Sequence, residues 1–183
     1  MALKKEAVIF YVVSFVLFVI GIFFDKKISE VVSYFQVEWL TEFMKWVSYI
    51  GTWFIVLVFM ACLFLWTEKK RKWIIPLLAS FFISLAITYF LKGIISRPRP
   101  LNIIVAETNS SFPSGHATAV FSTLAVLDRE FPRLRWFWLA FSILVVASRV
   151  YLNAHYLTDV IIGSVIGYSI GLLVVYITGK IKR

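Results

Sequence analysis

The sequence is poor in cysteine, histidine and charge. Its one cysteine, Cys62, lies inside an apolar run, which excludes a disulfide framework and a thiolate metal site. Charged residues make up only 16% of the 183 residues, whereas 61% are hydrophobic and 18% are aromatic. The mean hydropathy of +0.87 excludes an ordinary soluble globular domain and favours a membrane protein. No tandem repeat or low-complexity linker interrupts the chain.

Acidic residues are also scarce, ten against 19 basic residues, which gives a formal net charge of +9. In a soluble protein this excess would suggest nucleic acid as a partner. In so apolar a chain it is better explained by anionic lipid headgroups and by the preference of basic residues for the cytoplasmic side. We therefore expect membrane lipids as partners, no nucleic acid and no obligate protein partner.

Apolar segments recur along the chain at lengths suited to a hydrocarbon core of about 30 Å. We expect transmembrane helices at residues 7–24, 46–66, 73–91, 114–127, 136–152 and 158–177. Residues 28–45 mix acidic and apolar side chains at helical spacing, which is typical of an amphipathic interfacial helix or a short pair of helices. The expected fold is all-α: a polytopic membrane protein with a bundle of six transmembrane helices, forming one domain over residues 1–183.

Two local patterns refine these helices. The charged stretch 25–27 follows the first apolar segment where a signal peptide would have a cleavage site, so we expect this segment to remain as a transmembrane helix. In the last segment, glycines recur at every fourth position from Gly163 to Gly171, as expected for close contact between helices.

The basic residues predict an orientation. With the amino terminus in the cytoplasm, most of the 19 basic residues lie on the cytoplasmic side. Both termini are then cytoplasmic, in a multi-pass protein of the cell membrane. The loops 92–113 and 153–158 lie together on the outer side, facing the periplasm or the exterior.

The first of these loops gathers cations. Lys92, Arg97 and Arg99 lie within eight positions, and Pro98 and Pro100 stiffen the stretch. A phosphate dianion requires such fixed cations, because arginine offers a planar fork and lysine a point charge. These side chains could equally extend to water at the membrane edge without binding anything.

The same loop ends in Pro113, Ser114, Gly115 and His116, at the expected start of a helix. Serine and glycine at a helix start leave backbone N–H groups free, and the helix dipole favours an anion there. His116 lies in the first turn, close enough to share that anion. A lone histidine here could be a simple cap, but a second histidine on the same side of the membrane weakens that interpretation.

The second histidine, His155, lies in the stretch 148–159, beside membrane-like apolar sequence. Charge in hydrocarbon is costly, so ionisable residues there indicate function. Because Asp159 follows His155 by four positions, we expect Asp159 to accept a hydrogen bond from one ring nitrogen, leaving the other free to act as a nucleophile. Arg149 could complete a cationic cradle or, alternatively, form a buried ion pair with Asp159.

Three patterns together carry a family resemblance. Residues 92–100 read K-x6-R-P, residues 113–116 read P-S-G-H, and residues 148–159 read S-R-x5-H-x3-D. They resemble the signature of the type 2 phosphatidic acid phosphatase family, the membrane relatives of the vanadium haloperoxidases. The patterns occur in the family's order, without a departure at any signature position.

The resemblance implies a role for each signature residue. It implies that His155 attacks phosphorus and forms a phosphohistidine, that Asp159 orients it, and that His116 protonates the leaving oxygen and later helps to activate water. It also implies that the phosphoryl oxygens are held by Lys92, Arg99, Ser114, the Gly115 amide and Arg149. No metal or other cofactor is implied, and the outer loops offer no cluster of carboxylates for Mg²⁺. Arg97 lies outside the signature; it could contact a second phosphate or a lipid headgroup, or be an exposed cation.

A site at the membrane–water boundary suits a lipid phosphate whose tails stay among the helices. We therefore expect a lipid phosphate or pyrophosphate phosphatase. The family's candidate substrates are undecaprenyl pyrophosphate, lipid A 1-phosphate and phosphatidylglycerol phosphate, and the sequence does not select among them. A lipid-to-lipid phosphotransferase would use the same histidine, whereas a channel or lipid-binding scaffold would not need His155. A haloperoxidase is excluded because those relatives are soluble.

Overall fold

The computed structural model describes residues 5–52, 54–67 and 71–181, and all regular elements within these ranges are helices. In chain order they are α1 (Lys5–Tyr34), α2 (Glu38–Thr52), α3 (Phe54–Thr67), the 3-10 turn η1 (Arg71–Trp73), α4 (Ile74–Ile95), α5 (Gly115–Glu130), the 3-10 turn η2 (Pro132–Leu134), α6 (Arg135–Tyr151) and α7 (Leu157–Ile181). The predicted all-α class is confirmed, and α4 to α7 match the last four expected segments.

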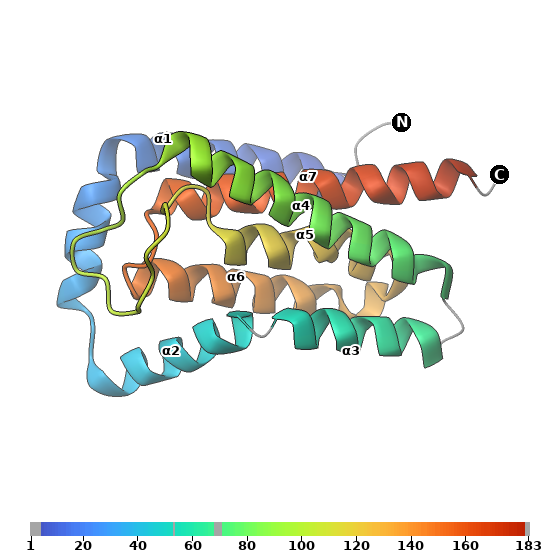
Figure 1. Cartoon of the computed structure of the whole chain (residues 1–183), viewed down its shortest axis with the longest axis horizontal. Coiled ribbons are helices and arrows are strands. Elements are labelled where there is room, and N and C mark those ends of the chain that lie inside the picture. The colour runs from blue at the N-terminus through green and yellow to red at the C-terminus, as the bar shows by residue number, and fades with distance from the viewer. Residues whose placement is uncertain (1–4, 53, 68–70, 182–183) are drawn as a thin grey trace.

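The helices surround α5, which lies in the middle of the bundle (Figure 1). Every residue from 117 to 127 of this helix is buried. Small and apolar side chains occupy all its faces, as is typical of a helix covered on all sides. Its most extensive contact is with α7, and α4 and α6 cover it from other directions.

The predicted glycine contact is confirmed at the interface of α5 and α7. A Cβ added at each of the α7 glycines from Gly163 to Gly171 would collide with a backbone carbonyl of α5, at Ser114, Thr118 and Ser122 in turn. Glycine therefore lets the two backbones touch. This close contact fixes the start of α7 against the start of α5.

The first helix is longer than expected. It continues to Tyr34, and in Figure 1 its later turns lie across the end of the bundle. Asp25 had marked the expected end, but it is 6% exposed and is paired with Arg97 and Thr158, so its charge does not interrupt the helix. The expected interfacial segment 28–45 is consequently divided between α1 and α2, and its position at the membrane surface stays a prediction.

Four helical stretches within the described ranges are long and apolar enough to cross a membrane: Lys5–Tyr34, Arg71–Ile95, Pro132–Tyr151 and Leu157–Lys180. The expected segment 46–66 corresponds instead to the end of α2 and to α3, with residue 53 outside the described residues. Its apolar part, Leu57–Thr67, and the 16-residue α5 are shorter than a full span. The count of six transmembrane helices therefore stays a prediction.

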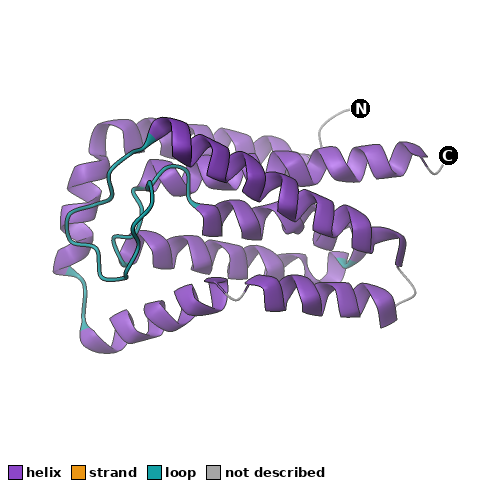
Figure 2. Ribbon diagram, in the orientation of Figure 1, coloured by secondary structure: helices purple, strands orange, loops and turns teal. Residues whose placement is uncertain are grey.

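The signature residues come together at one end of the bundle. The end of α4, the start of α5, the end of α6 and the start of α7 all lie there, covered by the loop 96–114 (Figure 2). The start of α1 and the end of α7 lie at the opposite end.

Candidate active site

The turn between α6 and α7 presents His155. The His155 amide donates to the Arg149 carbonyl (3.2 Å), which folds the chain back on the end of α6. Asn153 adopts a positive φ of 51°, a conformation that asparagine tolerates better than most residues. Its side chain accepts from Ser29 (2.9 Å) and donates to Ser33 (2.8 Å), so the last turns of α1 hold this turn in place.

The His155 ring is 2% exposed and has a defined tautomer. Nδ1 lies 2.6 Å from the Ser111 carbonyl oxygen and 3.7 Å from Oδ2 of Asp159. The expectation that Asp159 accepts the hydrogen bond of the ring therefore requires a correction: that acceptor is the Ser111 carbonyl. A carbonyl only accepts, so Nδ1 carries the proton and Nε2 keeps its lone pair. Sequence reasoning missed Ser111, because a backbone acceptor leaves no signal in the side-chain pattern.

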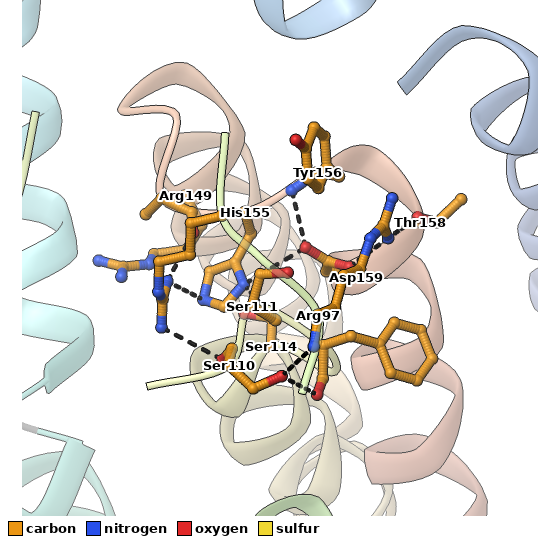
Figure 3. A network of polar contacts seen from close by, with 12 residues as sticks. Arg97, Ser110, Ser111, Ser114, Arg149, His155, Tyr156, Thr158 and Asp159 are labelled. Carbon is orange, nitrogen blue, oxygen red and sulfur yellow. Dashed lines mark hydrogen bonds and ion pairs between the residues drawn. The ribbon is translucent and has the colours of Figure 1, made fainter. Parts of the chain in front are cut away.

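Asp159 is fully buried, and both its oxygens have donors other than His155. Oδ2 accepts from the Tyr156 amide (2.9 Å), and Oδ1 accepts from Nη1 of Arg97 (2.5 Å). In Figure 3, Asp159 lies beside the His155 ring, with Arg97 and Thr158 on its other side. These contacts fix the carboxylate close to the ring and explain why it is not the direct partner of Nδ1.

Arg97 differs from its sequence interpretation. It is neither a free cation nor directed at an open phosphate site, because its guanidinium pairs with Asp159 and, at 2.9 Å, with Asp25. It also lies over the Tyr156 ring, 4.3 Å from the centroid. Asp25 was missed as a site residue, although a carboxylate adjoining an 18-residue apolar run is itself a functional signal.

Glu107 lies between two arginines of the signature. It accepts from Nη2 of Arg149 (2.6 Å) and from Nη2 of Arg99 (3.1 Å). The alternative of a buried Arg149–Asp159 ion pair is therefore wrong, because Arg149 pairs with Glu107. Sequence reasoning missed Glu107, which lies 21 positions from the nearest other acidic residue, Asp128, and in no recognisable pattern.

The remaining cations lie next to the ring. Nη1 of Arg99 lies 3.4 Å from Nε2 of His155 and donates to the Ala154 carbonyl (2.5 Å). Lys92, 8% exposed at the end of α4, donates to the Ser110 carbonyl. Because a guanidinium only donates, Nε2 of His155 accepts from Arg99 and lies against a cluster of buried positive charge.

The start of α5 lies against the start of α7. Ser114 is the N-cap of α5: its side chain accepts from the Ala117 amide, and its own amide donates to the Asp159 carbonyl (3.0 Å). Apart from the adjoining residues and the backbone of its own helix, nothing in the described part of the chain lies within 4 Å of the position where Gly115 would carry a Cβ, so this face of the helix start is open. His116 follows in the first turn and is half-buried. The structure thus brings the signature segments to one place.

The pKa values of the ionisable groups in the site shift in different directions. Burial lowers the pKa of His155 to about 4; Asp159 opposes this shift, and Arg149 and Arg99 add to it. Burial also lowers the pKa of Arg99, with Glu107 and Asp159 as partial compensation. Burial acts in the same direction on Arg97, but Asp159 and Asp25 outweigh it and raise its pKa. At neutral pH the His155 imidazole is therefore uncharged, as a nucleophile requires.

Comparison with known proteins agrees with this geometry. The family model of the PAP2 superfamily matches residues 73–183, more than half of the chain. The chain belongs to the PAP2 superfamily. The undecaprenyl-diphosphatase of Sulfolobus acidocaldarius is 30% identical over 172 residues, which cover 87% of this PAP2 chain and 82% of that protein. Phosphatidylglycerophosphatase B of Bacillus subtilis is 30% identical over 173 residues, covering 87% and 85%.

A solved structure has the same fold. The crystal structure of a transmembrane PAP2 type phosphatidylglycerolphosphate phosphatase from Bacillus subtilis matches with a TM-score of 0.82 and 26% identity, over 96% of this PAP2 chain and 97% of that one. The predicted phosphatase class is confirmed at the level of the family, and the protein is a multi-pass membrane protein.

Proposed function

We propose that this PAP2 protein hydrolyses the phosphate or diphosphate headgroup of a membrane lipid through a phosphohistidine on His155. The observation that carries the proposal is the state of the His155 ring. Its Nδ1 proton is held by the Ser111 carbonyl, so Nε2 carries the lone pair and accepts a hydrogen bond of 3.4 Å from Nη1 of Arg99. In the proposed reaction the substrate phosphate takes over this donor when Nε2 attacks. A neutral imidazole of fixed tautomer beside an anion site is poised to attack phosphorus.

In the first step, the lone pair of His155 Nε2 forms a bond to phosphorus while the bond from phosphorus to the lipid oxygen breaks. The bonding electrons go to the leaving oxygen, which takes a proton from His116. The ring becomes positively charged, and the nearby Asp159 carboxylate stabilises it. In the second step, His116 accepts a proton from water as the water oxygen attacks phosphorus, and the bond from Nε2 to phosphorus breaks.

The phosphoryl oxygens gain charge density in these steps, and fixed cations stabilise them. The groups assigned to this task are Lys92, Arg99, Arg149, Ser114 and the Gly115 amide. Because Glu107 bridges two of these arginines, substrate phosphate takes the place of its carboxylate. The described residues contain no group of three or more histidine, cysteine or acidic side chains placed to hold a metal ion, so we assign the charge stabilisation to the cations.

The orientation proposed is a site on the outer face and both termini in the cytoplasm, with α3 and α5 completing six transmembrane helices. The asymmetry of basic residues supports it, as does the position of the start of α1 and the end of α7 opposite the site (Figure 1). One relative at 30% identity is named for a polyprenyl diphosphate and another for phosphatidylglycerol phosphate. We therefore keep both lipids, together with lipid A 1-phosphate, as candidate substrates.

Phosphate release from these three lipids by purified protein in detergent, with EDTA present, tests the proposal. We expect turnover of at least one lipid, inhibition by vanadate, and loss of activity in His155→Ala by about three orders of magnitude or more. Rapid quenching should trap an acid-labile phosphoryl-protein in the wild type and none in His155→Ala, which lacks the nucleophile. Full activity in a folded His155→Ala protein would overturn the mechanism.

A further inference from the structure

Asp25 is a carboxylate of α1 buried against two other segments. Its Oδ1 accepts from the Thr158 amide (3.1 Å). Its Oδ2 accepts from Nη2 of Arg97 (2.9 Å) and from the Thr158 hydroxyl. A charge beside apolar sequence is costly unless it is paired and hydrogen-bonded, and the start of α7 and the loop before α5 supply these partners.

Arg97 connects this carboxylate to the site. Nη1 donates to Oδ1 of Asp159 (2.5 Å) and to the Thr158 hydroxyl (2.6 Å), while Nη2 donates to Asp25. The side chains of Asp25 and Asp159 are 7% and 0% exposed, so both ends of the bridge are screened from water. A planar guanidinium holds two carboxylates at a fixed angle, which an ammonium group cannot do.

A glycine in α1 allows this helix to pack closely against the start of α7. A Cβ at Gly21 would lie 2.7 Å from the Thr158 methyl group and 3.3 Å from Oδ1 of Asp25. The backbone of α1 therefore approaches the start of α7 at a distance that only glycine allows. This packing brings Asp25 to the bridge independently of the charges.

We propose that Asp25 and Arg97 form a clamp that positions Asp159 beside the nucleophile, and that both are positioning residues for the reaction. The inference rests on the proposed phosphatase function. The clamp holds Oδ1 of Asp159, so that Oδ2 stays 3.7 Å from Nδ1 of His155 while that nitrogen keeps its hydrogen bond to Ser111. The carboxylate then faces the ring when phosphorylation makes it positive. Without the clamp, Oδ1 of Asp159 loses its ion pair, and the hydrogen bond from the Tyr156 amide to Oδ2 is left to hold the carboxylate beside the ring.

Steady-state kinetics of Asp25→Asn, Arg97→Gln and the double variant test the clamp. Asp25→Asn keeps the shape of the side chain and removes its charge. We expect Arg97→Gln to lower kcat on the order of tenfold, Asp25→Asn to lower it less, and KM to stay unchanged in both, because neither residue touches the substrate. The double variant should lose no more than Arg97→Gln alone, since the two residues act as one unit. Arg97→Lys should not restore the wild-type kcat.

Glu30→Gln is the matched control on the same helix, because Glu30 is exposed and pairs only with Lys27 in the described part of the chain. Each variant is also tested for thermal unfolding and for vanadate affinity, and a wild-type value of both shows an intact fold and anion site. Wild-type kcat in both single variants would overturn the clamp, and so would a parallel loss of vanadate affinity, kcat and stability, which indicates a purely structural role. Absence of turnover and of vanadate binding in the wild type would instead overturn the phosphatase function.

Discussion

Arg97 and Arg99 are separated by a single proline, yet their surroundings are opposite. Arg97 lies between two almost completely buried carboxylates, Asp25 and Asp159, which raise its pKa. Arg99 lies next to Nε2 of His155, and burial lowers its pKa against the opposing effect of Glu107 and Asp159. The two side chains carry the same charge but have different partners.

The difference lies in how the charge is balanced. Two carboxylates pair with Arg97, so its charge is balanced within the protein without a ligand. Arg99 and Arg149 share the single carboxylate of Glu107, whose side chain is 23% exposed on the loop. With Lys92 nearby, positive charge exceeds negative charge there, so this cluster still attracts an anion. We therefore propose that Arg97 is part of the scaffold and that Arg99 belongs to the receptor for phosphate.

Loss of Arg149 is the strongest way to test this contrast. Its side chain is 2% exposed and paired with Glu107, and its replacement removes a cation that we propose to hold the phosphoryl oxygens. We expect Arg149→Gln to lower kcat/KM by about 10² to 10³, as for the loss of one preorganised donor in other active sites. The measurement is phosphate release from the best lipid substrate, with vanadate affinity as a second readout.

Arg133→Gln is the control, because Arg133 is exposed in η2, far from the site along the bundle. The contrast predicts a larger loss in Arg149→Gln than in Arg97→Gln, and a loss of substrate affinity only in Arg149→Gln. Equal losses in the two variants would show that the scaffold and the receptor are not distinct.

Much of the fold could be predicted because its signals are local. Apolar runs predicted the helical class, and the spacing from Gly163 to Gly171 predicted the close contact with α5 that the structure contains. The signature patterns named residues that the chain brings to one place. In each case a periodicity or a short motif carries the information, without reference to distant parts of the chain.

The missed features depend on partners far apart in the sequence. The charge of Asp25 does not end α1, because Arg97 and Thr158 pair with it in the folded protein. These partners are 72 and 133 positions away in the sequence, so no local pattern predicts the pairing. The ion pairs of Glu107 follow from the path of a loop, which no periodicity describes. The acceptor for His155 is a backbone carbonyl, and every residue has one.

Replacement of Glu107 should strengthen anion binding at Arg99 and Arg149, the opposite of the effect expected for Arg149→Gln. Without the carboxylate, Arg99 and Arg149 lose their resident anion, so an incoming anion no longer competes with it. We expect Glu107→Gln to bind vanadate and inorganic phosphate about three- to tenfold more tightly, a gain on the order of 1 kcal/mol. Inhibition constants in the lipid phosphatase assay give this value directly.

The matched control is Glu42→Gln, which removes an exposed carboxylate that pairs with Lys45 and not with an arginine of the signature. It should leave both inhibition constants unchanged. Weaker vanadate binding in a stable Glu107→Gln protein would contradict the idea of an exchangeable anion. It would indicate instead that Glu107 holds the arginines in position.

The smallest expected effect is a shift in the titration of His155. The chain has two histidines, so NMR of protein labelled at histidine, with His116→Asn for assignment, resolves the ring. The pKa of His155 is lowered to about 4 by burial, against the opposing effect of Asp159. The ring should therefore stay neutral from pH 7 to pH 5 and take up a proton only near pH 4.

Arg99 and Arg97 should differ in their effect on the pKa of His155. Arg99 contributes to the lowered pKa of His155, so Arg99→Gln should raise it, whereas Arg97→Gln should change it less. The sign for stability follows from linkage: the unfolded chain binds a proton near pH 6.5 and the folded ring does not, so acidification from pH 6.5 toward pH 4 favours unfolding. Titration of His155 near pH 6.5 in the folded protein would contradict its burial, and a larger shift in Arg97→Gln than in Arg99→Gln would assign Arg97 to the receptor.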